Sequence, residues 1–120
     1  GENQEFGTDT VDARHFTAYS AAHSTVKGAG MADAQTIRLM NPMNYIAHRQ
    51  EGPQHWRIRV GTADRDTSHA IAVILATRLQ NTGKQVDLFM PWDVPHSGDY
   101  DLDELFGWID RTVAAGKGGR

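Results

Sequence analysis

Strand-like and helix-like runs alternate along the second half of the chain, and this alternation constrains the fold more than any other feature. Residues 55–60, "HWRIRV", alternate apolar side chains with arginine, which is the period of a strand. Residues 70–79, "AIAVILATRL", are nearly all apolar, which predicts a helix that is buried on more than one side. Residues 85–90, "QVDLFM", predict a second strand. Strands that alternate with helices predict an α/β fold with a parallel sheet and right-handed crossovers.

The ends of two helices carry recognisable signals. Thr67 or Ser68 is expected to cap the first helix, and Gly83 is a typical residue just past its end. Asp101, followed three residues later by Glu104, predicts a capping box at the start of a final helix. Apolar residues lie at helical spacing along one face of that helix: Leu102, Leu105, Phe106, Ile109 and Val113.

The chain has 120 residues, which suits one domain that we divide into three parts. Residues 1–31 are polar and spotted with glycine, and they predict a loop-rich lid or connecting segment with some helical turns between residues 12 and 22. Residues 32–115 form the α/β part, which starts with a short helix over residues 32–39 that stops before Pro42. Residues 116–120 are expected to be a disordered tail.

Composition excludes several classes of function. The chain has no cysteine, which rules out disulfides, thiolate metal sites and cysteine nucleophiles. Its formal net charge of −3 offers no basic surface for nucleic acid, and no apolar run is long enough to span a bilayer. We therefore expect neither a nucleic acid nor a membrane as a partner. The sequence does not indicate a compartment.

Two aspartates and a histidine follow the predicted strands. Asp64 and Asp66 come directly after the first strand, and His96 comes after the second. Catalytic groups in parallel sheets collect beyond the carboxyl ends of the strands. Neighbouring strands lie about 4.8 Å apart, so loops at these ends can bring a carboxylate and an imidazole into hydrogen-bonding reach. A carboxylate that fixes the tautomer of a histidine is the supporting half of a Ser-His-Asp triad.

Each of these residues also has a simpler interpretation. Asp64 can be a turn residue, and Asp66 can be a charge that the start of a helix favours. His96 can be an ordinary loop histidine.

The two loops together resemble one enzyme family. "GTADRDT", residues 61–67, and "VPHSGDYDLDELFGWID", residues 94–110, are similar to the C-terminal part of an α/β-hydrolase, and more narrowly to the bacterial tannase-like serine esterases. The family order is nucleophile, acid and histidine, and here Asp64 precedes His96 by 32 residues. The stretch from Gly61 to Asp64 matches the G-x-x-D turn that carries the acid in these enzymes. "LMNPMNYI", residues 39–46, is also similar to the segment that precedes the acid-bearing strand.

The resemblance implies a serine carboxylic-ester hydrolase that cleaves galloyl or related hydroxybenzoyl esters through an acyl-enzyme. Asp64 would then orient His96, which would act as general base and afterwards as general acid. Asp66 would bind phenolic hydroxyls of the galloyl ring, and Glu2 is a candidate for a second carboxylate with that role. The resemblance implies neither a metal nor a cofactor.

The nucleophile that this chemistry requires is missing from the sequence. None of the serines lies in a G-x-S-x-G motif: Ser20, Ser24, Ser68 and Ser97. We therefore expect the rest of the enzyme, either a separate chain or a further segment, to supply the serine, and we expect this chain alone to be inactive. Another α/β-hydrolase activity (a feruloyl or acetyl esterase, or a peptidase) and a non-catalytic binding module are the alternatives.

The remaining chemically distinctive residues favour structural roles. The other histidines show no H-x-x-x-H metal spacing: His15, His23, His48, His55 and His69. Trp56 and Trp108 are expected in the core. Trp92 is expected to pack, with a wall of the substrate pocket as the alternative. Arg57 and Arg59 are expected to pair with neighbouring acidic residues.

Overall fold

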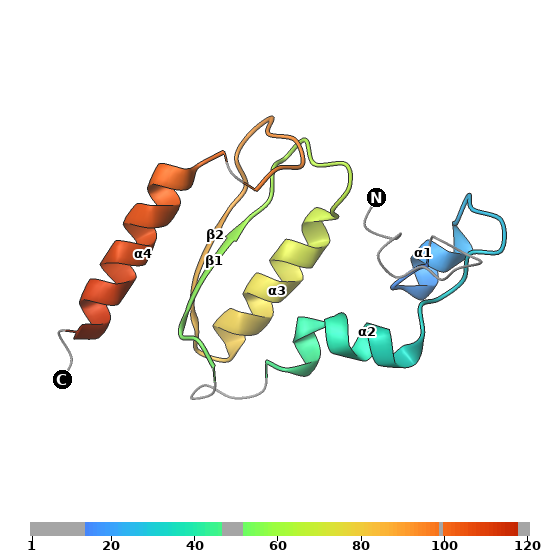
Figure 1. Ribbon diagram of the computed structural model, residues 1–120, viewed down its shortest axis with the longest axis horizontal. Helices are drawn as coiled ribbons and strands as arrows, with labels where there is room; N and C mark the ends of the chain where they lie inside the picture. The colour runs from blue at the N-terminus through green and yellow to red at the C-terminus, as the bar shows by residue number, and fades with distance from the viewer. Residues whose placement is uncertain (1–13, 47–51, 99, 118–120) are drawn as a thin grey trace. The chain divides into compact units, whose positions relative to one another are not determined.

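The computed structural model describes residues 14–46, 52–98 and 100–117 of the chain (Figure 1). They fall into two compact units, Gly1–Ala47 and His48–Arg120. In the described ranges no helix is both long enough and apolar enough to cross a membrane. The expected boundary between the loop-rich segment (residues 1–31) and the α/β part (residues 32–115) stays a prediction. The last helix extends to Lys117, into the segment that we expected to be a disordered tail.

The first unit contains short helices that begin at polar caps. α1 (Ala18–Ala22) starts after Thr17, whose hydroxyl accepts a hydrogen bond from the Ser20 amide at 3.1 Å. α2 (Ala34–Met40) starts after Asp33, whose carboxylate accepts a hydrogen bond from the Thr36 amide at 2.9 Å. These side chains satisfy amides that have no partner within the helix.

Proline ends α2 as the sequence predicted. Asn41 has extended backbone angles (φ −90°, ψ 105°), because a following proline disfavours the helical conformation. A single 3₁₀ turn, η2 (Pro42–Asn44), comes next. The helix expected over residues 32–39 is thus confirmed, with its start two residues later.

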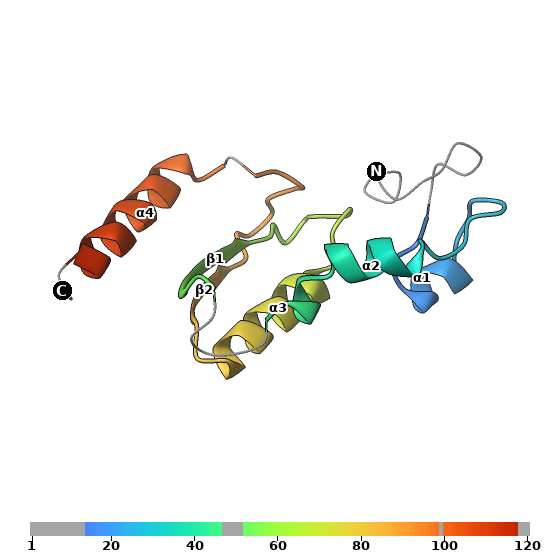
Figure 2. The same cartoon turned by 60° about the horizontal axis from the view of Figure 1, so that its bottom comes forward.

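Two parallel strands form the centre of the second unit. β1 (His55–Arg59) pairs with β2 (Gln85–Phe89), and the register runs from His55 opposite Gln85 to Arg59 opposite Phe89. α3 (His69–Asn81) connects the strands and packs against them, as Figures 1 and 2 show. A small α/β arrangement with a parallel sheet is therefore confirmed.

The ends of α3 follow the predicted signals. Ser68 is the N-cap, and its hydroxyl accepts a hydrogen bond from the Ala70 amide at 3.3 Å. Gly83 lies just past the helix with φ +79°, a conformation that glycine adopts without steric cost. The Lys84 amide then returns to the Leu79 carbonyl at 3.1 Å, which is typical of a glycine-terminated helix.

Within the described residues only one face of α3 is buried, and burial on more than one side stays a prediction for the complete enzyme. Ala72, Ala76 and Leu79 face the sheet, and Leu79 is fully buried. Ile71 and Ile74 are 61% and 55% exposed. A sheet of two strands covers only one face of a helix, and so the apolar side chains on the other face stay in contact with solvent.

The final helix, α4 (Leu102–Lys117), begins directly after Asp101. Asp101 occupies the predicted N-cap position, because its carbonyl accepts a hydrogen bond from the Leu105 amide at 3.0 Å, and its carboxylate also binds Arg57 of β1. Glu104 also lies toward Arg57, at 3.9 Å. Most of the predicted apolar face is exposed, with Phe106 at 60%.

The tryptophans differ in burial. Trp56 and Trp108 are half-buried, and the Trp56 indole N–H donates a hydrogen bond to the Pro53 carbonyl at 2.9 Å. Trp92 is 87% exposed, so the expectation that it packs is wrong within this chain. It lies in the loop after β2, where the described residues offer it little apolar surface.

Candidate active site

Asp64 lies in a tight turn that follows β1. Its amide donates to the Gly61 carbonyl at 3.1 Å, which closes the turn. Its Oδ1 accepts hydrogen bonds from the amides of Asp66 and Thr67, each at 2.9 Å. The Thr67 amide, followed by the Asp66 amide and His96, holds the pKa of Asp64 below its usual value, because these groups favour the charged form. Asp64 is therefore an ionised carboxylate in a fixed orientation, and its side chain is only 6% exposed.

Hydrogen bonds join the turn that carries Asp64 to the loop that carries His96. The Thr62 amide donates to the Pro91 carbonyl and the Ala63 amide donates to the Val94 carbonyl, both at 3.0 Å. In return, the Asp93 amide donates to the Thr62 hydroxyl at 2.7 Å. Asp93 has φ +57°, a left-handed conformation that aspartate tolerates better than most residues. These hydrogen bonds thus fix the position of the turn that carries Asp64 relative to the loop that carries His96.

Gly61 permits this close approach. A Cβ atom added at Gly61 would lie 2.0 Å from the Val94 carbonyl oxygen and 3.0 Å from the Pro95 carbonyl oxygen. Both obstacles are backbone atoms, which cannot rotate away as a side chain could. The first residue of the G-x-x-D turn therefore has to be glycine for a steric reason.

The structure brings Asp64 and His96 together. The Nδ1 atom of His96 lies 3.0 Å from Oδ2 of Asp64. Because the carboxylate is ionised and can only accept, the proton of this bond is on Nδ1 and the lone pair of the neutral ring is on Nε2. The His96 side chain is 52% exposed. This geometry suits a histidine that takes and returns a proton through Nε2.

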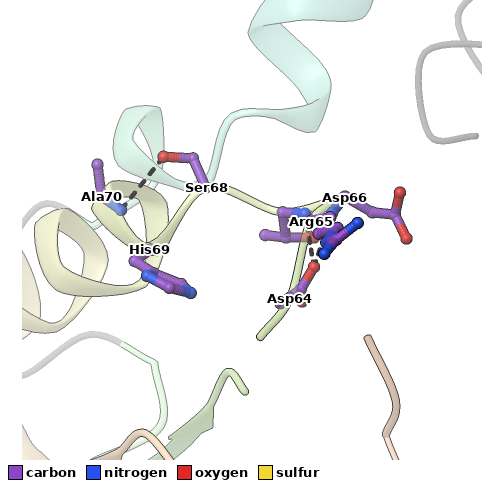
Figure 3. Close-up of a pocket in the computed structure, with 7 residues that line it drawn as sticks. Asp64, Arg65, Asp66, Ser68, His69 and Ala70 are labelled. Carbon is purple, nitrogen blue, oxygen red and sulfur yellow. Dashed lines mark hydrogen bonds between the residues drawn. The ribbon is translucent and has the colours of Figure 1, made fainter. Parts of the chain in front are cut away.

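Asp66 lies beside this pair, at the edge of an open pocket lined by residues 64–70. Figure 3 shows its side chain pointing away from Asp64, with the cap of α3 on the other side of the pocket. Asp64, Asp66 and His96 each offer a ligand atom within 4.8 Å of one another, a set that could hold a cation. Sequence spacing did not indicate this set, because its members come from two distant loops. The oxygens of Asp64 already accept hydrogen bonds from two amides and His96, so we assign Asp64 to the histidine.

The remaining candidate residue and the other serines do not belong to this site. Glu2 is outside the described residues. The first unit contains a histidine–serine contact that the sequence did not reveal: Nδ1 of His15, a residue only 5% exposed, lies 2.7 Å from the Ser20 hydroxyl. Ser68 caps α3, and Ser24 accepts a hydrogen bond from the Val26 amide.

A parallel sheet with a carboxylate–imidazole pair beyond the carboxyl ends of its strands is typical of α/β-hydrolases. Neither a protein-family model nor a curated protein matches the sequence. Solved structures do match. The native tannin acyl hydrolase of Lactobacillus plantarum is 53% identical over 91% of this chain and 24% of its own, with a TM-score of 0.69.

Two other structures agree with this match. A tannin acyl hydrolase in complex with ethyl gallate is 52% identical over 92% of this chain and 24% of its own, with a TM-score of 0.71. The tannase of Fusobacterium nucleatum is 45% identical over 93% of this chain and 24% of its own, with a TM-score of 0.72. The chain is thus similar to a segment of the bacterial tannases, and it spans about 24% of their length.

Proposed function

We propose that this chain is part of a tannase-type serine esterase that hydrolyses galloyl or related hydroxybenzoyl esters through an acyl-enzyme. The observation that carries the proposal is the 3.0 Å contact between His96 and Asp64 in a chain that is 52% identical to a tannin acyl hydrolase. In this proposal the chain supplies the acid and the base of a Ser-His-Asp triad.

The roles of the two residues follow from their hydrogen bond. Nε2 of His96 takes the proton of the serine hydroxyl as its oxygen attacks the ester carbonyl carbon, and it then gives that proton to the departing alcohol. In the second half-reaction His96 takes a proton from water, which attacks the acyl-enzyme, and returns the proton to the serine oxygen. Asp64 stabilises the imidazolium form in both halves, because it is ionised and already oriented.

The substrate is an ester of a polyhydroxylated benzoic acid in this proposal. Structures of related tannin acyl hydrolases hold ethyl gallate and 3,4-dihydroxybenzoate. Asp66 is exposed at the pocket beside His96, where its carboxylate can accept hydrogen bonds from adjacent phenols. Each charge-assisted bond of this kind contributes about 1.5–3 kcal/mol. Glu2 is proposed as a second phenol-binding carboxylate from the resemblance alone.

The remaining part of the enzyme is the partner that this chemistry requires. It would supply the serine nucleophile and the oxyanion hole. It would also cover apolar surface that the chain leaves open, such as Ile71 and Ile74 on α3 and Phe106 on α4. We expect the 120 residues alone to be inactive.

Ester selectivity tests the proposed activity. The complete enzyme should hydrolyse methyl gallate far faster than methyl ferulate, because ferulate lacks the adjacent phenols that Asp66 would bind. Faster cleavage of ferulate would indicate another α/β-hydrolase activity instead. If no serine of the complete protein reacted with a fluorophosphonate, the chain would be part of a non-catalytic binding module.

A further inference from the structure

A cluster of ion pairs joins the two strands to the residue that precedes α4. Arg57 and Arg59 of β1 contribute its positive charges. Asp87 of β2 and Asp101, which precedes α4, contribute the negative ones. The expectation that the two arginines pair with acidic residues is confirmed. These ion pairs therefore connect β1 both to β2 and to the start of α4.

The arginines bind to different parts of the second unit. Arg59 forms a bidentate contact with the Asp87 carboxylate, with hydrogen bonds of 3.1 Å and 3.0 Å, and so links β1 to β2. Arg57 donates a hydrogen bond to Asp101, and Nε of Arg59 lies 3.5 Å from the same carboxylate oxygen. Asp101 is therefore held by two guanidinium groups that project from one strand.

The contact between Arg57 and Asp101 is well shielded from water. The Arg57 side chain is 7% exposed and the Asp101 side chain is 18% exposed. A pair in such surroundings is screened much less by solvent than an exposed pair. It therefore fixes the position of Asp101 far more firmly than a surface contact could.

His96 lies on the chain between two fixed points. On one side, Val94 is held by the Ala63 amide, in the turn that also carries Asp64. On the other side, Asp101 is held by Arg57. Both restraints come from β1 or from the turn that follows it, so Val94 before His96 and Asp101 after it are each held by the element that positions the partner carboxylate of His96.

Tyr100 lies next to Asp101 in the chain and has a polar group shielded from water. Its hydroxyl is buried, and no described residue forms a hydrogen bond with it. Burial raises the pKa of Tyr100 and the negative charge of Asp101 raises it further, while the positive charges of Arg59 and Arg57 partly offset this rise. The phenol is therefore within electrostatic reach of the ion pairs.

We propose that the Arg57–Asp101 ion pair is a positioning latch that sets the distance between His96 and Asp64. This inference rests on the proposed function, because it concerns His96 as the catalytic base. Asp101 and Arg57 are positioning residues in this account, and they do not touch the substrate.

The test compares variants of the complete enzyme. Asp101→Asn keeps the shape of the side chain and removes its charge, and it should lower kcat about ten- to hundredfold while KM changes little, because misplacement of a catalytic group impairs the chemical step. Glu104→Gln is the matched control, since Glu104 lies 3.9 Å from Arg57 and its side chain is 75% exposed. We expect that change to alter kcat by less than about twofold.

A second variant distinguishes a loss of positioning from a loss of folded protein. Asp101→Asn leaves the buried Arg57 charge with only the exposed Glu104 at 3.9 Å, so that variant can lose stability as well as activity. The double variant Arg57→Leu with Asp101→Asn removes both charges and should fold. It should still show the reduced kcat. A double variant with wild-type kcat would overturn the latch.

Proton NMR of the resting enzyme separates this inference from the proposed function. The Nδ1 proton of His96, identified by its loss in His96→Ala, should give a downfield signal that broadens or shifts in the double variant and stays in place in Glu104→Gln. This readout needs no substrate, so it tests the latch even if the enzyme cleaves no gallate. An unchanged signal in the double variant would refute the latch, whereas failure to hydrolyse gallate would refute only the proposed activity.

Discussion

The contact between the acid turn and the histidine loop predicts a large effect of Gly61→Ala. The new Cβ would lie 2.0 Å from the Val94 carbonyl oxygen, whereas real contacts of this kind essentially never fall below 3.0 Å. The loops must therefore separate by about 1 Å. The Nδ1–Oδ2 contact between His96 and Asp64 measures 3.0 Å, and the same separation would take it to about 4 Å, beyond hydrogen-bonding range.

The expected loss follows from that displacement. A catalytic group that is misplaced by about 1 Å costs on the order of a hundredfold in rate, so kcat for methyl gallate should fall by about that factor. The overpacked turn should also lower the free energy of unfolding by about 1–3 kcal/mol. Steady-state kinetics and urea denaturation of the complete enzyme measure the two effects.

Gly98→Ala is the matched control for this prediction. Gly98 lies in the same loop as His96, and a Cβ added there meets no atom within 4 Å. Its kcat should stay within about twofold of wild type, as for an ordinary surface substitution. If Gly61→Ala were as active as Gly98→Ala, the loops would not depend on this close approach, and the steric account would be wrong.

Three further predictions follow from the same contacts. Asp64→Asn should lower kcat by about 10⁴-fold in the complete enzyme, because the amide no longer fixes the His96 tautomer, and near-normal kcat would remove Asp64 from the triad. Asp66→Ala should raise KM for methyl gallate far more than for methyl benzoate, and equal effects on both esters would rule out a contact with the phenols. Arg59 lowers the pKa of Asp87 below 3.8, chiefly through their hydrogen bonds, so their pair stabilises the fold fully above that pH and the contribution is lost as the pH falls through the lowered value. Asp87→Asn should therefore reduce the free energy of unfolding at pH 7 by up to about 1 kcal/mol, since the carboxylate is 46% exposed, and a difference that did not shrink as the pH was lowered would contradict this.

Local signals in the sequence predicted the elements of the second unit well. The strand period of residues 55–60, the Ser68 cap and Gly83 each act over a few residues, and each recurs in the structure. The same holds for Pro42 at the end of α2. These features depend on backbone sterics and on hydrogen bonds between residues close in the chain, so they can be predicted from a short stretch of sequence.

Burial was harder to predict, because it depends on what covers a residue. The apolar character of α3 suggested burial on several sides, yet the described chain offers one sheet face, and Ile71 remains exposed. Trp92 is exposed for a similar reason. The capping signal placed Asp101 at the start of α4, but it did not indicate that a buried arginine from a distant strand also binds its carboxylate.

In the candidate site, too, some features could be predicted from the sequence and others could not. Topology alone predicted that the loops after the two strands would meet, and the contact between His96 and Asp64 agrees with it. Their catalytic roles, and those of Asp66 and Glu2, stay predictions. The Arg57–Asp101 pair could not be found by spacing, because its members are 44 residues apart and the capping box that contains Asp101 does not indicate a distant arginine.

Reaction with a fluorophosphonate tests the central claim most directly, namely that His96 activates a serine supplied by the rest of the enzyme. The measurement is the labelling rate of the complete enzyme and of its His96→Ala variant, with the labelled serine located by mass spectrometry. The account predicts rapid labelling of one serine outside these 120 residues and a rate at least about a hundredfold lower in the variant. Labelling of Ser20, Ser24, Ser68 or Ser97, or an equal rate in the variant, would contradict it.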